Sequence, residues 1–418
     1  MRVLVYPHAM EIGGSQLNAL QLAGAVRDLG HEVTVLSEPG PLVEYVRELR
    51  LPHVEIPLHR RRPSAGVARR IGGLIDDLGI DVVHGHEWPP VLEAVAATVA
   101  TPARRNTAVF ATVMSMSVVP FFPRAVPMTV GTEEIRAAAL AAGHRRVTLL
   151  EPPVDTDADH PGLETSFREE HGLDPAVPLL AMICRLVPEL KLEGLLAACD
   201  AVGELAVAGR KVQLVIVGDG RSRPEVEAHA VRANELAGSR VVVLTGEISD
   251  PRPAYAAADV LVGQGGSALR GMSFGKPLVV VGERGFSELL TRETAPRFLS
   301  AGWYGQGPGS RGSGVPGLRD TLDYVIANPV LRQELGAFSR ELVLERFSLR
   351  GAAELLEREY TAARYGPRPL GPLAVDAARS AAGLLGYKLH RKYQGLRGTA
   401  RTDDANANPV LSRERAVR

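Results

Sequence analysis

Short apolar segments rich in valine and leucine alternate with segments of helical periodicity along this chain. Between the first two apolar segments, SQLNALQLAGAVRDL (15–29) has apolar residues at helical spacing and ends at Gly30. Strands that are apolar on both faces and separated by helices predict a parallel sheet covered on each side. In the first half of the chain we expect strands at residues 2–6, 32–36, 54–57, 81–83, 107–113, 128–131 and 147–150.

The alternation stops once and then resumes. Residues 151–167 (EPPVDTDADHPGLETSF) are rich in Pro, Asp and Thr and lack periodicity, which is typical of a linker. The sequence therefore predicts an α/β protein with two doubly wound parallel sheets that face each other across a cleft. Ligands in such folds bind at the carboxyl ends of the strands. The second series of strands is expected at residues 179–184, 212–218, 241–246, 260–263 and 278–282.

The rest of the chain divides by composition. The segment 302–317 (GWYGQGPGSRGSGVPG) is typical of a mobile surface connection, with a lid as the alternative. We expect residues 377–398 to form a basic amphipathic helix that either contacts an anionic membrane surface or is solvated. We predict five segments: a Rossmann-like domain (1–155), a linker (156–167), a second Rossmann-like domain (168–345), a helix that crosses back to the first domain (346–365) and a basic or disordered tail (366–418).

Bulk composition excludes several classes of protein. Basic and acidic residues balance at 48 each in 418 residues, so nucleic acid is not an expected partner. No apolar run reaches the roughly 20 residues that cross a bilayer. The N-terminus lacks the features of a signal peptide, and the two cysteines form no disulfide framework. We expect a cytoplasmic protein, with peripheral attachment to the inner face of the membrane as the alternative to a free one.

Two cations follow the strand at 179–184. Arg185 comes directly after it and Lys191 opens the next helix, so both are expected at the carboxyl edge of the sheet. The chain has five lysines against 43 arginines, so a lysine here indicates a need for a compact ammonium. Such a pair is suited to a diphosphate. The alternative is an exposed ion-pair network with Glu189 and Glu193.

Glycine turns precede helices at two places. Gly13 and Gly14 come before the first helix, and Gly265 and Gly266 come before a helix that opens at Ser267. Amides at a helix start are suited to an anion, and a tight turn without a ligand is the alternative. No carboxylate lies near the second turn, in VLVGQGGSALRGMSFGKPLVVV.

Two histidines follow the strand at 81–83, in DVVHGH. Alternation places His84 and His86 on the same face at the carboxyl end of this strand. We predict His84 as a catalytic residue and His86 as a substrate contact, with a structural role as the alternative. No third ligand lies nearby in the sequence, so we expect neither a metal nor a cofactor.

In order along residues 1–363, these segments resemble the retaining GT-B glycosyltransferases of family four, which use nucleotide-sugar donors. The resemblance implies a GT-B fold with an acceptor-binding first domain and a nucleotide-sugar-binding second domain. It rests on GGSQLNALQLAGAVRDLGHEVTVL, DVVHGH and PVDTDADHPG in the first half, and on CRLVPELKLEGLLAA, VQLVIVGDGRSRPEVE, GEISDPRPAYAAADV, GMSFGKPLVVVGERGFSELL and LRQELGAFSRELVLERFSLRGAAELLEREY in the second.

The resemblance implies roles for individual residues. Arg185 and Lys191 hold the donor diphosphate, and Gly14 packs its amide against the phosphate and the transferred sugar. The base and ribose lie near residues 247–250 and the helix after Ser267. The full set of predicted substrate contacts is Gly13, Gly14, His86, Gly265, Gly266, Ser267, Arg270, Glu283 and Glu288.

The sequence also departs from the family pattern. Family members commonly carry two glutamates around the second glycine turn; the second corresponds to Arg270, and the first has no counterpart in the shorter turn. The family histidine after AVFATV corresponds to Met114. The expected activity is retaining transfer of a hexose from a nucleoside-diphosphate sugar to a sugar, lipid-linked or small-molecule acceptor. Two alternatives remain open: a catalytically weak partner or binding subunit, and a sugar-nucleotide 2-epimerase, which needs paired carboxylates.

Overall fold

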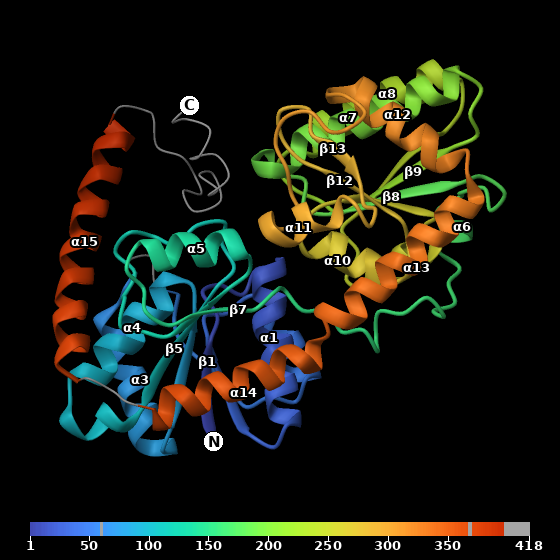
Figure 1. Cartoon of the computed structure of the whole chain (residues 1–418). Helices are drawn as coiled ribbons and strands as arrows, with labels where there is room; N and C mark the ends of the chain where they lie inside the picture. The colour runs from blue at the N-terminus through green and yellow to red at the C-terminus, as the bar shows by residue number, and fades with distance from the viewer. Residues whose placement is uncertain (59–61, 367–369, 397–418) are drawn as a thin grey trace. The chain divides into compact units, whose positions relative to one another are not determined.

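The computed structural model describes residues 1–58, 62–366 and 370–396. The chain divides into two compact units (Figure 1). The first unit contains residues 1–153 and returns from residue 349 onward, and the second contains residues 154–348. Each unit is an α/β structure built around one sheet, as the alternating pattern predicts.

The sheet of the first unit has seven parallel strands in the order β3-β2-β1-β4-β5-β6-β7. Each predicted strand is present, but β4 runs beyond the predicted end at residue 83 and contains both histidines. The strands are β1 (Arg2–Tyr6), β2 (Glu32–Ser37), β3 (His53–Glu55), β4 (Val82–His86), β5 (Ala108–Val113), β6 (Met128–Val130) and β7 (Val147–Leu149).

Helices cover both faces of this sheet because its strands are apolar on both sides. Val3 and Val5 of β1 pack into one core, whereas Leu4 and Tyr6 pack into the other. The helices are α1 (Gly14–Asp28), α2 (Val43–Glu48), α3 (Ala65–Leu78), α4 (Trp88–Val99), a 3-10 turn (Pro102–Asn106), α5 (Glu133–Ala141), α14 (Leu349–Tyr365) and α15 (Leu370–Leu396).

The sheet of the second unit has six strands in the order β10-β9-β8-β11-β12-β13. Its five predicted strands are present and parallel, and the short edge strand β13 is antiparallel and was not predicted. The strands are β8 (Leu179–Ile183), β9 (Gln213–Val217), β10 (Val242–Gly246), β11 (Val260–Gly263), β12 (Leu278–Val281) and β13 (Ser287–Leu289).

Helices also cover both faces of the second sheet. In α7, Glu189 and Leu190 have non-helical backbone angles, so the regular helix begins at Lys191. The helices are α6 (Phe167–Glu170), α7 (Pro188–Val207), α8 (Arg223–Ala237), α9 (Arg252–Ala257), α10 (Gly266–Ser273), α11 (Ala295–Ala301), α12 (Gly314–Ile326) and α13 (Pro329–Arg346).

The predicted linker and the C-terminal segments have defined places. Residues 156–167 belong to the second unit, where the Asp159 side chain is 2% exposed. Helix α14 belongs to the first unit and packs against α1 and β5 (Figure 1). The predicted tail contains α15, which packs against α4, while residues 397–418 lie outside the described chain. No helix in the described part is long and apolar enough to cross a membrane.

Part of the glycine-rich segment 302–317 is packed into the second unit: residues 303–305 and 307 are buried, whereas residues 310–313 are exposed as a surface connection would be. Trp303 and Tyr304 are each 4% exposed. Gly305 lies so close to the ring of Phe286 that a Cβ would stand 2.5 Å from it. Glycine at position 305 therefore permits this close packing.

Candidate functional site

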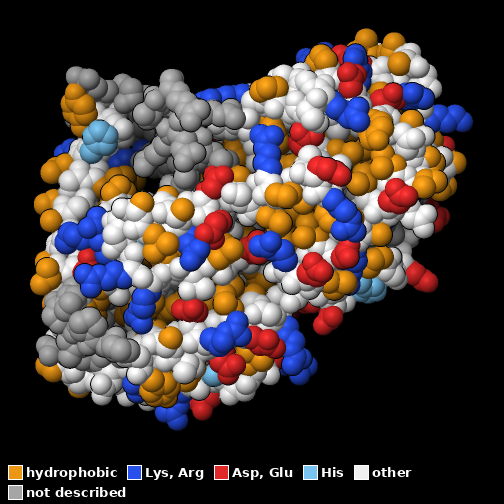
Figure 2. All heavy atoms as spheres, in the orientation of Figure 1, with side chains coloured by type: hydrophobic (Ala, Val, Ile, Leu, Met, Phe, Trp, Pro, Cys, Tyr) orange, Lys and Arg blue, Asp and Glu red, His pale blue; other side chains and the backbone are white. Residues whose placement is uncertain are grey.

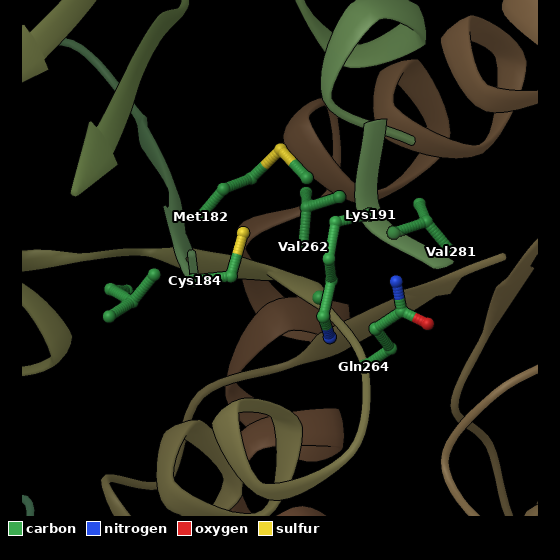
Figure 3. Close-up of a pocket in the computed structure, with 8 residues that line it drawn as sticks. Met182, Cys184, Lys191, Val262, Gln264 and Val281 are labelled. Carbon is green, nitrogen blue, oxygen red and sulfur yellow. The ribbon is translucent and has the colours of Figure 1, made fainter. Parts of the chain in front are cut away.

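A small pocket opens at the carboxyl ends of β8 and β11 in the second unit (Figure 3). It has room for about one water molecule. Lys191 and Gln264 are its polar side chains, and Figure 3 shows both entering it beside Cys184. The lining residues are Met182, Ile183, Cys184, Lys191, Val262, Gly263, Gln264 and Val281.

The turn that carries Arg185 is held by the loop after β9. Leu186 donates its amide to the Asp219 carbonyl at 2.9 Å. A Cβ at Gly218 would lie 2.0 Å from the Cys184 carbonyl oxygen, and both Gly218 and Gly220 have positive φ. Only glycine is compatible with such an approach. The sequence GDG after β9 therefore fixes the position of the Arg185 turn.

Lys191 is placed by an unusual turn at the start of α7. Leu190 has φ +64°, which is a strained conformation for a branched side chain. The Gln264 amide donates to the Leu190 carbonyl and thereby supports this turn. Strain of this kind persists only where the surrounding structure enforces it. Gln264 is therefore a positioning residue for Lys191 that sequence reasoning missed.

The acidic residues nearby are bound elsewhere. Glu189 pairs with Arg221, and Glu193 accepts from the amides of Arg284 and Gly285. The ion-pair network that was the alternative for the two cations is therefore absent from the described structure.

Arg185 and Lys191 consequently form a cationic pair with no acidic partner in the described chain. Partial burial lowers the pKa of Lys191, and the charge of Arg185 lowers it further. Burial raises the pKa of Cys184 despite both cations, so its thiol stays neutral. Because the charge of Arg185 acts on Lys191, a bound anion here would favour the charged form of the lysine.

The N-terminus of α10 adds amide donors on the β11 side of the site. Gly265 has φ +60° and ψ −140°, a conformation reserved for glycine. Its amide donates to the Trp303 carbonyl at 2.8 Å, so Gly265 shapes the turn and does not offer a donor. Within the described residues, the amides of Gly266, Ser267 and Ala268 have no backbone acceptor. Such free amides at a helix start favour an anion.

Arg270 does not project freely into the site. Its Nε and Nη2 donate to the two carboxylate oxygens of Asp159 at 2.8 and 2.9 Å. Although burial opposes the charge, this pair raises the pKa of Arg270. The backbone carbonyl of Asp159 accepts hydrogen bonds from the Ser273 hydroxyl and from Nη1 of Arg340. Nothing in the sequence links positions 159 and 270, so Asp159 was missed.

Glu283 and Glu288, which we predicted to contact substrate, are both hydrogen-bonded to the 302–317 segment. Glu283 accepts from the Tyr304 hydroxyl and the Gln306 amide. Glu288 is 6% exposed and accepts from the amide and hydroxyl of Ser310. Both carboxylates therefore fasten the 302–317 segment to the sheet.

In the first unit, the first glycine turn lies at the carboxyl end of β1. Gly13 caps α1 without a side-chain bond, and Gly14 begins the helix with open space where a Cβ would stand. Ser15 donates to Gln16, whose amide lies 3.2 Å from Nε2 of His8. Gly14 therefore leaves room for a ligand to approach the helix start.

His84 is a core residue, which corrects its assignment as catalytic. It is 1% exposed, and burial lowers its pKa well below the ordinary value. Nε2 of His84 is hydrogen-bonded to the Thr112 hydroxyl at 2.7 Å, which in turn is hydrogen-bonded to the Thr129 hydroxyl at 2.7 Å. Nδ1 of His84 is hydrogen-bonded to the Tyr360 hydroxyl at 2.6 Å. Both ring nitrogens of His84 are thus used to join β4 to β5 and α14.

His86 has a different environment at the end of the same strand. Its ring lies 4.2 Å from that of His84, it is 4% exposed, and its Nε2 has no partner in the described structure. Burial lowers the pKa of His86 to about 3, so the ring is neutral at ordinary pH. An unpaired, buried nitrogen at a strand end is compatible with the predicted substrate contact.

Residues of the described chain offer no group of three or more His, Cys, Asp or Glu that could hold a metal. The candidate site is therefore made of cations, helix amides and neutral polar side chains. In an α/β unit of the doubly wound class, such a site is suited to an anion.

Comparisons with known proteins agree with this class. Models of two families match consecutive parts of the chain: Glycosyltransferase Family 4 over residues 12–158 and Glycosyl transferases group 1 over residues 177–302. The 2-deoxystreptamine glucosyltransferase of Streptomyces kanamyceticus is 30% identical over 245 residues, covering 56% of this chain and 59% of that protein. The chain thus spans about three fifths of this relative.

Solved structures show the same fold. A glycosyltransferase from Rickettsia africae superposes with a TM-score of 0.70 at 18% identity, covering 88% of this chain and 99% of that one. HepE from Anabaena, solved in complex with UDP, superposes with a TM-score of 0.65 at 14% identity, covering 87% and 100%. The fold is GT-B, and the two glycosyltransferase family models match the two halves of this fold in chain order.

Proposed function

We propose that this protein transfers a hexose from a nucleoside-diphosphate sugar to an acceptor hydroxyl with retention of anomeric configuration. The observation that carries the proposal is the pair Arg185 and Lys191, two cations without an acidic partner beside the free amides of α10. HepE, which shares the fold, binds UDP and UDP-glucose in its solved complexes. A diphosphate is the anion that best matches two cations and a helix start.

The proposed chemistry needs little acid or base from the protein. The bond between the anomeric carbon and the β-phosphate oxygen breaks, and the acceptor oxygen bonds to the same face of that carbon. The departing phosphate oxygen takes the proton of the acceptor hydroxyl. Arg185 and Lys191 stabilise the charge that develops on the phosphate, and the fixed geometry supplies the remaining advantage.

Arg270 favours the second candidate, a glycosyltransferase-like binding subunit, since α10 carries no carboxylate. An assay of UDP release from UDP-glucose distinguishes the active transferase from the binding subunit. We would supply 2-deoxystreptamine as the acceptor, because a relative is named for it. TDP-, ADP- and GDP-glucose would be tested in parallel. The active enzyme is expected to turn over one donor, and NMR of the product is expected to show the donor's anomeric configuration.

Lys191→Ala is expected to lower kcat about 10²- to 10³-fold, as the loss of a group that stabilises transition-state charge does. Lys211→Ala is the matched control, because this exposed lysine precedes β9. It therefore lies at the amino ends of the strands, away from the carboxyl ends that carry the candidate site. Nucleotide binding by the folded protein without turnover of any donor would favour the binding subunit.

We also propose peripheral contact with an anionic membrane through α15. Val375, Leu385 and Leu389 are 72%, 62% and 61% exposed, and Figure 2 shows hydrophobic side chains along the outer edge of this helix. The helix carries one acidic residue, Asp376, which is bound by Arg379. Flotation with phosphatidylglycerol vesicles but not with phosphatidylcholine vesicles is expected, and Leu385→Asp should abolish it. Equal flotation with both vesicles, or with neither, would contradict the contact.

A further inference from the structure

The C-terminal helix α15 is attached by polar side chains to the loop that follows β5, residues 114–127, which we call the β5 loop. We infer that the Asp376 and Arg379 pair of α15 positions the β5 loop as one wall of the acceptor site. The inference rests on the proposed function, because it takes the acceptor to bind at the carboxyl edge of the first sheet.

The β5 loop begins where this sheet is expected to hold a ligand. In the first unit β1 and β4 are neighbours, but the chain leaves them in opposite directions, toward β2 and toward β5. Ligands of doubly wound sheets bind at such a switch point, outside the carboxyl ends of the strands. Glu87 follows β4 directly, and its Oε1 accepts from the amides of Met114 and Ser115 at 2.9 and 3.0 Å. The first residues of the β5 loop therefore lie beside the switch point.

The backbone of Glu87 is strained at this place. Its φ is +66° and its ψ is 176°, a combination that is essentially restricted to glycine. Glycine would relieve the strain but could not hold the two amides. Strain of this kind clusters at binding and catalytic sites. The neighbouring His86 is 4% exposed, and its Nε2 has no partner in the described residues. Two separate features therefore mark the end of β4 as a place for a ligand.

The far end of the β5 loop is held by α15. Asp376 is 8% exposed, and its Oδ2 accepts from the Ala125 amide at 2.7 Å. Its Oδ1 accepts from Nε of Arg379 at 2.8 Å. Nη2 of Arg379 donates to the Phe122 carbonyl at 2.6 Å, and Nη1 donates to the Pro120 carbonyl at 3.4 Å. The pair thus bonds to three backbone groups of the loop.

Aromatic packing joins the two ends of the loop. Phe121 is 2% exposed, and its ring lies 5.3 Å from that of Trp88, which begins α4, and 5.2 Å from that of Tyr387 in α15. A Cβ at Gly383 would stand 2.8 Å from the Phe121 Cβ, so glycine allows α15 to approach this side chain. Between the two anchors, residues 116–119 are half-buried. These residues are the part of the loop that an acceptor can reach, and α15 fixes where they lie.

The pair acts through the backbone that it holds. Asp376→Ala leaves the Ala125 amide and the Arg379 guanidinium without their carboxylate, so the loop is free to shift. A displacement of about 1 Å in a positioning element can cost about a hundredfold in rate. The proposed diphosphate site belongs to the second unit and contains none of these residues, so the effect should fall on the acceptor.

The test compares the kinetics of acceptor and donor in the full chain, with 2-deoxystreptamine as the acceptor and the sugar nucleotide that the wild type turns over. For Asp376→Ala and for Arg379→Ala, we expect the acceptor KM to rise about tenfold or more while the donor KM stays within about twofold. Asp376→Asn, whose side-chain oxygen still accepts from Ala125, should show a smaller rise. Lys392→Ala changes an exposed cation of the same helix and should leave both constants unchanged.

A loss of kcat alone, equal changes in both KM values, or no change would overturn the inference and leave the proposed function intact. Absence of turnover by the folded wild type with every donor would instead count against the proposed function. Hydrogen exchange tests the positioning without an acceptor: the amides of residues 114–119 should exchange about tenfold faster in Asp376→Ala and at the wild-type rate in Lys392→Ala. Unchanged exchange in Asp376→Ala would overturn the inference.

Discussion

Removing Arg270 should destabilise the second unit far more than removing an exposed arginine of the same unit. Arg270→Ala leaves the Asp159 carboxylate, which is 2% exposed, without either of its charged donors. Breaking a buried ion pair on one side costs about 3–5 kcal/mol. Because Arg270 itself is 26% exposed, we expect about 3 kcal/mol. Adding Asp159→Asn should recover part of this loss, since the unpaired charge is then gone.

The free energy of unfolding of the second unit can be followed separately, because Trp88 lies in the first unit and Trp303 in the second. In a Trp88→Phe background, urea unfolding followed by fluorescence reports the second unit through the buried Trp303. Arg319→Ala is the control: this arginine is 39% exposed, lies 3.1 Å from Glu204 and should cost about 1 kcal/mol or less. An Arg270→Ala cost no larger than the control, or no recovery with Asp159→Asn, would refute the reasoning.

Three further predictions concern the pocket and the buried histidines. Gln264→Glu places a carboxylate beside Lys191, so the affinity for a nucleoside diphosphate should fall about tenfold or more, as measured by calorimetry. An unchanged affinity would mean that Lys191 is not in the binding site. Because the pKa of Lys191 is lowered, the same affinity should be full near neutral pH and fall as pH rises toward the ordinary value of 10.5; a flat alkaline profile would contradict this. The pKa of His86 is about 3 against an ordinary 6.5, so the unfolded state binds more protons between these values and stability falls on acidification through this window. The loss should approach about 5 kcal/mol and be smaller in His86→Phe, measured by Trp88 fluorescence in a Trp303→Phe background. Equal loss in both proteins would exclude His86 as its source.

The sequence was sufficient to predict most strands of both sheets, because apolar periodicity and β-branched composition are local signals. All twelve predicted strands are present, while β13 was missed because Ser287–Leu289 is short and contains a buried glutamate. The end of β4 was placed too early for a related reason. His84 is polar, yet its two hydrogen bonds allow a strand to continue through it into the core.

The candidate site was only partly predictable. The positions of Arg185 and Lys191 follow from their place after a strand, but the absence of an acidic partner depends on where Glu189 and Glu193 point. Similarly, Asp159 lies in a segment whose composition is that of a linker, and its pairing with Arg270 spans 111 positions. Such long-range pairs leave no periodic signal in a single sequence.

The central claim is that the Arg185 and Lys191 pair binds the diphosphate of a sugar nucleotide. Its most direct test is calorimetric titration of UDP, GDP, ADP and TDP into the wild type, into Arg185→Ala/Lys191→Ala, and into the control Lys211→Ala/Arg240→Ala. The control changes two exposed cations that precede β9 and β10, at the amino ends of these strands. We predict micromolar binding of at least one nucleotide by the wild type and the control, and its loss in the double variant. Binding that survives in the double variant, or no binding by the folded wild type, would contradict the account.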